Sequence, residues 1–130
     1  MALGPILIVD DNPANVKLVS FVLATSGFDV RAAPDAQAAL AMLKTFRPRL
    51  ILMDLQLPGM DGFELTRRLK AQDATRDIII VALTAYAMNG DEQRARAAGC
   101  DGYISKPIDT AGFPGLISAY LSGTPELSGT

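Results

Sequence analysis

Three short, uninterrupted apolar runs constrain the fold of this chain most strongly. They read ILIV at residues 6–9, LILM at residues 50–53 and IIIVAL at residues 78–83. A strand with one face in water alternates apolar and polar residues, whereas a strand covered on both faces is apolar throughout. The runs therefore predict central strands of a sheet that has no solvent-facing side.

Helical patterns alternate with these runs along the chain. Helices are predicted at residues 12–25, at residues 36–43 (stopping before Pro48), from the turn at residues 58–62 to residue 70, at residues 91–98 and at residues 113–121, with further strands at residues 28–33 and 102–104. The helix at residues 91–98 offers mostly alanines to a core, namely Ala95, Ala97 and Ala98. Five strands alternating with five helices imply right-handed crossovers and a parallel α/β sheet covered on both faces.

The bulk composition predicts one cytoplasmic domain. At 130 residues the chain can bury a core without disulfides, and it has only one cysteine, Cys100, which we expect to be a small packed residue. We assign residues 1–122 to the domain and residues 123–130 to a flexible tail rich in Gly, Ser and Pro. The net charge of -2, with both signs scattered, predicts neither a nucleic-acid partner nor a membrane partner.

The absence of histidine excludes several kinds of chemistry. With no histidine in the chain, histidine acid/base catalysis, Ser-His triads and His-ligated zinc are all impossible. A phosphohistidine cannot form on this chain either. If phosphate is involved, the histidine that donates it must belong to another molecule.

The polar residues that follow the predicted strands fall at one edge of the sheet. Asp10 and Asp11 follow the first strand, Asp54 the third and Thr84 the fourth, and Ser105-Lys106 follow the fifth. Binding sites of parallel α/β sheets form beyond the carboxyl ends of the strands. We therefore expect these side chains to share one site.

The residue types at this edge favour phosphoryl transfer. Three carboxylates repel one another unless a cation joins them, and oxygen ligands are those that Mg²⁺ prefers. A carboxylate such as Asp54 becomes a nucleophile toward phosphorus when a metal neutralises the phosphoryl oxygens. Lys106 supplies a mobile cation, and Thr84 a hydroxyl that can donate to a phosphate oxygen.

The motifs ILIVDDN, LILMDLQLPGMDG, IIIVALTA and YISKPID resemble, in order and spacing, those of response-regulator receiver domains. The resemblance covers the chain from about Pro5 to Leu121. It implies the flavodoxin-like (βα)5 fold, a doubly wound five-stranded sheet in the order 2-1-3-4-5. It also implies a histidine kinase or histidine phosphotransfer protein as the phosphoryl donor, a downstream protein target, and a monomer or weak dimer.

The same resemblance assigns roles to single residues. Asp54 would be the phosphoacceptor, and Asp10 and Asp11 would hold Mg²⁺ with Asp54, Asp11 being the direct ligand. Gln56 would offer its backbone carbonyl to the metal. Thr84 would be the switch hydroxyl, Lys106 the phosphate-binding lysine aimed by a cis Lys106-Pro107 bond, and Tyr103 the aromatic switch. One departure from the pattern is the segment GFPG at residues 112–115, which disfavours a dimer surface built on a long last helix.

Other functions fit the sequence less well. A phosphatase of the haloacid dehalogenase type needs an acid two residues after the nucleophile, where this chain has Gln56. Flavodoxin-like FMN binding needs a neutral phosphate loop, which Asp10 and Asp11 contradict. A pseudo-receiver, which binds partners without phosphorylation, is the main alternative, disfavoured because every functional position is filled. We therefore expect no enzyme beyond self-phosphorylation from small donors and autodephosphorylation.

Overall fold

Strands and helices alternate through the part of the chain that the structure describes. The structure is a computed structural model and describes residues 4–55, 57, 59–84, 91–105 and 108–122. The elements are β1 (Pro5–Val9), α1 (Pro13–Thr25), β2 (Asp29–Ala33), α2 (Ala36–Met42), β3 (Leu50–Asp54), α3 (Gly62–Lys70), β4 (Ile79–Thr84), α4 (Asp91–Ala98), β5 (Gly102–Ser105) and α5 (Phe113–Leu121). None of the described helices combines the length and the hydropathy needed to cross a bilayer.

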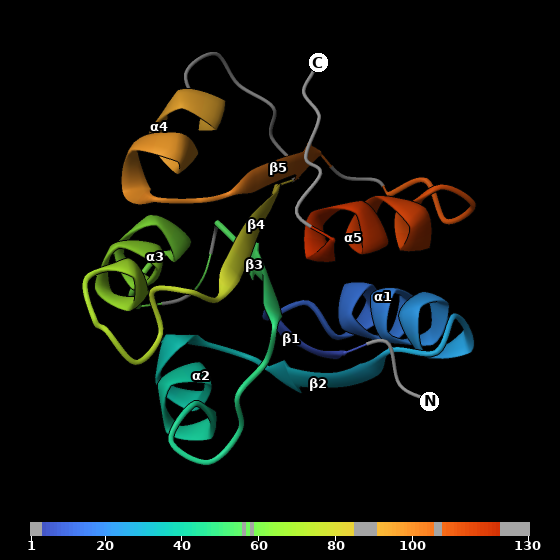
Figure 1. Cartoon of the computed structure of the whole chain (residues 1–130), viewed down its shortest axis with the longest axis horizontal. Helices are drawn as coiled ribbons and strands as arrows, with labels where there is room; N and C mark the ends of the chain where they lie inside the picture. The colour runs from blue at the N-terminus through green and yellow to red at the C-terminus, as the bar shows by residue number, and fades with distance from the viewer. Residues whose placement is uncertain (1–3, 56, 58, 85–90, 106–107, 123–130) are drawn as a thin grey trace.

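The strands form one parallel sheet in the order β2-β1-β3-β4-β5. Figure 1 shows α1 and α5 on one face of this sheet and α2, α3 and α4 on the other. This arrangement confirms the predicted doubly wound α/β fold and its strand order. The predicted element bounds agree with the structure to within one residue for the strands, and the last helix begins at Phe113 as expected.

The protein has one hydrophobic core on each face of the sheet. The apolar runs contribute to both cores, because successive side chains of a strand point to opposite faces. In β1, Ile6 and Ile8 pack with residues of α1 and α5, whereas Leu7 and Val9 pack on the side of α2, α3 and α4. Alternate residues of β3 divide between the two cores in the same way. The central strands β1, β3 and β4 need uninterrupted apolar residues because both of their faces are covered, whereas the edge strand β2 is mostly exposed.

Short polar side chains cap the amino-terminal ends of three helices. The side-chain oxygens of Asn12, Asp35 and Asp61 each accept a hydrogen bond from the backbone N–H three residues later, at 3.1, 2.8 and 2.8 Å. Such N-caps satisfy donors that the helix itself leaves unpaired. They fix where α1, α2 and α3 begin, and therefore where the loops from the preceding strands must end.

Helix α4 packs against the rest of the protein mainly through small side chains. Ala95 and Ala98 are buried, but Ala97 is exposed, so the expectation that all three alanines face the core was wrong. Residues three apart share a helix face, and Ala97 lies off the face formed by Ala95 and Ala98. The guanidinium of Arg94 lies 4.3 Å from the ring centroid of Phe63 in α3, which adds a cation–π contact to this sparse packing.

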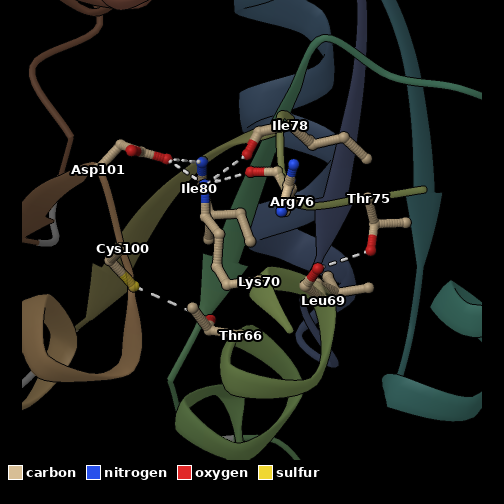
Figure 2. Close-up of polar contacts among 9 residues, drawn as sticks. All are labelled: Thr66, Leu69, Lys70, Thr75, Arg76, Ile78, Ile80, Cys100 and Asp101. Atoms are coloured by element: carbon tan, nitrogen blue, oxygen red, sulfur yellow. Dashed lines mark hydrogen bonds and ion pairs between the residues drawn. The ribbon is translucent and has the colours of Figure 1, made fainter. Parts of the chain in front are cut away.

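A polar cluster ties the amino ends of β4 and β5 to α3 (Figure 2). The Asp101 carboxylate accepts hydrogen bonds from the Ile80 backbone N–H and the Lys70 ammonium, both at 2.9 Å. The ammonium also donates to the carbonyls of Arg76 and Ile78, at 3.1 and 2.9 Å. One lysine therefore joins the end of α3, the following loop and the strand pair.

Cys100 is a packed residue beside this cluster, as predicted. Its thiol is buried and donates to the hydroxyl of Thr66 at 3.8 Å (Figure 2). Burial raises the pKa of the Cys100 thiol above its ordinary value. Because the thiolate is the reactive form, this cysteine is expected to be chemically inert.

We predict that Asp101→Ala destabilises the protein by roughly 1–3 kcal/mol, because it removes an acceptor from two donors of which one is a strand N–H. The matched control is Asp73→Ala. Asp73 pairs with Arg76 at 3.2 Å, but its side chain is 92% exposed, so its loss should cost less than about 0.5 kcal/mol. Urea unfolding of both variants measures the difference, and equal midpoints would contradict the role given to Asp101.

Candidate functional site

The strand register brings the predicted site residues to one edge of the sheet. Val9 pairs with Met53, so the residues that follow them, Asp10 and Asp54, come to neighbouring positions. Asp54 itself pairs with Leu83, which places Thr84 one residue beyond, at the end of the next strand. The carboxyl ends of β1, β3 and β4 therefore present three polar side chains side by side, as the sequence predicts.

Three carboxylates meet at this edge. Asp10, Asp11 and Asp54 each offer an oxygen, and these three oxygens lie within 4.8 Å of one another. Asp10 is 2% and Asp54 is 6% exposed, whereas Asp11 is exposed. Repulsion between like charges is stronger where water is partly excluded. The cluster is therefore unfavourable for the fold unless hydrogen bonds or a cation compensate it.

The start of α1 provides two of the compensating hydrogen bonds. The backbone N–H of Asn12 donates to Asp10 Oδ1 at 2.9 Å, and the side-chain amide of Asn15 donates to Asp10 Oδ2. Both carboxylate oxygens are thus held by the first turn of the helix that follows them. Asn15 was missed in the sequence, although its position three residues after the cap Asn12 places its side chain on the turn nearest the strand end.

The turn after β3 approaches the backbone of Asp54 closely. A Cβ atom added to Gly62 would lie 2.5 Å from the Asp54 carbonyl oxygen and 2.8 Å from Leu55 Cα. The Gly62 N–H donates to the Leu55 carbonyl at 3.2 Å, and Asp61 caps the helix that begins there. The sequence indicated a turn at this place but gave no sign that its last glycine lies against the Asp54 backbone.

The predicted switch residues lie on the two strands beyond Asp54. Thr84 is buried at the end of β4 and pairs with Ser105. Tyr103 lies two pairs earlier on β5, opposite Ala82, and is half-buried against the core formed with α2, α3 and α4. Gln56, Lys106 and the Lys106-Pro107 bond lie outside the described residues, as does the predicted tail at residues 123–130.

The donor set fits a hard divalent cation. Three carboxylates with oxygens so close together are ligands of the type and spacing that Mg²⁺ uses, and the exposure of Asp11 leaves one side open to water and to a further ligand. A carboxylate beside such a cation can act as a nucleophile toward phosphorus. The geometry therefore suits a metal-assisted reaction at a buried carboxylate more than it suits a structural ion pair.

Comparison with known proteins gives a consistent picture. The family model of the response regulator receiver domain matches residues 6–117. The polar-differentiation response regulator DivK of Brucella anthropi is 44% identical over 116 residues, which cover 89% of this chain and 94% of that protein.

Solved structures agree with the sequence comparison. The signal receiver domain of a signal transduction histidine kinase from Syntrophus aciditrophicus is 31% identical, with a TM-score of 0.85 and coverage of 98% of this chain and 96% of that one. The receiver domain of the sensor histidine kinase PA1611 from Pseudomonas aeruginosa is 35% identical, with a TM-score of 0.82 and coverage of 93% and 98%. That second structure has a magnesium ion coordinated in its active site cleft.

We predict that Gly62→Ala costs roughly 1–3 kcal/mol of stability, because the new methyl group must push the backbone at Asp54 aside. Gly115→Ala is the control. A Cβ there meets nothing within 4 Å, and alanine favours the helix α5, so this variant should equal or exceed the wild type by up to about 1 kcal/mol. Urea unfolding tests both, and wild-type stability of Gly62→Ala would show that the turn adapts freely.

Proposed function

This chain belongs to the response regulator receiver domain family, and from that membership we propose that Asp54 accepts a phosphoryl group from a phosphohistidine of a partner protein, with Mg²⁺ bound beside it. The observation that supports this most is the position of Asp54. It is the buried carboxylate of β3, and it shares a three-carboxylate cluster with Asp10 and Asp11. The proposed acceptor therefore lies beside two further carboxylates that can bind the same Mg²⁺ ion.

The transfer step is a substitution at phosphorus. An Asp54 carboxylate oxygen forms a bond to phosphorus while the bond from phosphorus to the histidine nitrogen breaks, and that nitrogen keeps the electron pair. The product is an aspartyl phosphate. Asp10, Asp11, Asp54 and the backbone carbonyl of Gln56 would hold Mg²⁺, which when bound supplies the positive charge that offsets the phosphoryl oxygens. The protein contributes mainly positioning.

The switch follows from the added charge. An aspartyl phosphate carries about -1.5 to -2 charges in place of the single negative charge of Asp54, together with new acceptor oxygens. We assign the Thr84 hydroxyl and the Lys106 ammonium to these oxygens, with Tyr103 moving inward as Thr84 turns. Helix α4 lies on the path of this change. It buries the methyl groups of Ala95 and Ala98, each contributing roughly 0.8 kcal/mol, so a few kcal/mol can shift it.

The partners follow from the same chemistry. Membership of the receiver family favours a histidine kinase or a histidine phosphotransfer protein as the phosphoryl donor, and the phosphohistidine must lie on that partner because this chain has no histidine. We further propose that the protein acts in the cytoplasm, as a monomer or weak dimer, on a downstream protein target. It is not an enzyme toward other substrates, and its own reactions are self-phosphorylation from small donors and autodephosphorylation.

The acceptor is tested by intact-mass measurement after incubation with acetyl phosphate and Mg²⁺. The wild type should gain one phosphoryl group and lose it in hydroxylamine, since an acyl phosphate is labile there. Asp54→Asn should gain none, and EDTA should prevent labelling of the wild type. Asp35→Asn, which keeps a side chain able to cap α2, should label like the wild type.

Two outcomes would contradict this assignment in different ways. A phosphoryl group on Ser or Thr that is stable in hydroxylamine would show that this residue, and not Asp54, is the acceptor. Absence of label on the wild type, from acetyl phosphate and from histidine kinases alike, would favour a pseudo-receiver that binds its partners without phosphorylation.

The switch is tested with Thr84→Ala, which should still accept phosphate but lose the difference in partner binding between the two states. Backbone amide shifts on adding beryllofluoride, a phosphoryl mimic, should cluster at residues 84–108 in the wild type and shrink at α4 in the variant. Shifts clustered instead at residues 14–46 would place the output face on the other side of the molecule.

A further inference from the structure

We propose that Asn15 is a positioning residue for the metal site, acting through Asp10. This role rests on the proposed function, because it concerns the same carboxylates. Asn15 itself does not touch the metal or the phosphoryl group in this proposal. It holds the Asp10 carboxylate in the orientation in which Asp10, Asp11 and Asp54 together accept Mg²⁺.

Two groups at the start of α1 donate hydrogen bonds to the Asp10 carboxylate. The Asn12 N–H donates to one carboxylate oxygen at 2.9 Å and the Asn15 side-chain amide donates to the other. The Asp10 carboxylate cannot rotate without breaking at least one of these bonds. Asp10 is 2% exposed, so water has little access to replace a lost donor. The Asn15 amide is therefore a specific constraint on this carboxylate.

Asn15 is tied into the cap of the same helix. Its backbone N–H donates to the Asn12 side chain at 3.1 Å, while its side chain reaches back to Asp10. The cap thus fixes the position of the Asn15 side-chain amide relative to the end of β1. Asparagine suits this place because its amide donates without adding charge. A carboxylate there could not donate, and it would bring a fourth negative charge to the cluster.

Partners that orient metal-binding groups affect metal affinity strongly. Their loss lowers affinity by roughly 10–100-fold in sites where it has been measured. A hydrogen bond from Asn15 uses one of the two lone pairs of an Asp10 oxygen, so it orients the carboxylate without preventing Asp10 from facing the metal or a metal-bound water. The exposed Asp11 is then the direct ligand, and Asp10 the fixed support behind it.

The test is a Mg²⁺ titration of the full chain without phosphoryl donor, in which the backbone amide chemical shifts report the affinity for Mg²⁺. Asn15→Ala should weaken Mg²⁺ binding by about tenfold. The control is Thr75→Val, which also removes one side-chain hydrogen bond, from Thr75 to the Leu69 carbonyl at 2.6 Å, but at the opposite end of the sheet. It should lower the midpoint of thermal unfolding and leave Mg²⁺ binding unchanged. The Mg²⁺ concentration for half-maximal labelling by acetyl phosphate should rise in Asn15→Ala only.

The outcomes separate this inference from the proposed function. Asp11→Ala is titrated in parallel. If it weakens Mg²⁺ binding while Asn15→Ala binds as tightly as the wild type or more tightly, the role of Asn15 is overturned and the metal site stands. If Asp11→Ala also has no effect, the metal site itself is wrong. Should Asn15→Ala not fold, Asn15→Leu, which keeps the side chain's size without its donor, carries the same expectation.

Discussion

The sheet has helices on both of its faces, and this constraint governs where polar chemistry can occur in the molecule. The residues of β1, β3 and β4 that pack against the helix layers are apolar, since a buried polar group without a partner is costly, and the two polar residues of these strands, Asp54 and Thr84, are the last of β3 and β4. Polar side chains are tolerated only where the strands end. Parallel strands end together, so the carboxylates of Asp10, Asp11 and Asp54 are brought close despite their repulsion.

The two ends of the sheet differ in how their charges are arranged: opposite charges pair at one end, and like charges cluster at the other. At the amino end of β4 and β5, the Lys70 ammonium and the Asp101 carboxylate satisfy each other and three backbone groups. At the carboxyl end, like charges face one another, and hydrogen bonds from α1 to Asp10 offset part of the cost. One end therefore contributes to stability, while the other is electrostatically unfavourable unless a cation binds there. Helix α4, which lies between β4 and β5 in the chain, buries the small side chains of Ala95 and Ala98.

The fold and the carboxylate cluster could be predicted because they depend on periodicity and on the ends of strands, which are local properties of a sequence. Contacts between distant segments could not. Nothing in the sequence indicates that Gly62 lies against the Asp54 backbone or that Lys70 reaches Asp101. Ala97 was misplaced for a related reason, since a helix of eight residues has too few apolar positions to define its buried face. The hydrogen bond from Asn15 to Asp10 depends on the direction in which α1 leaves the end of β1, and the sequence does not indicate that direction.

We propose that the three carboxylates form a cation site and that one of its two buried members, Asp54, accepts the phosphoryl group. A crystal structure of the chain grown with Mn²⁺ and beryllofluoride tests it most directly, because the anomalous signal of Mn²⁺ locates the ion independently of its ligands. We predict one ion between the carboxylates of Asp11 and Asp54, and a beryllium atom bonded to an Asp54 oxygen. An ion elsewhere, or beryllofluoride attached to another side chain, would contradict it.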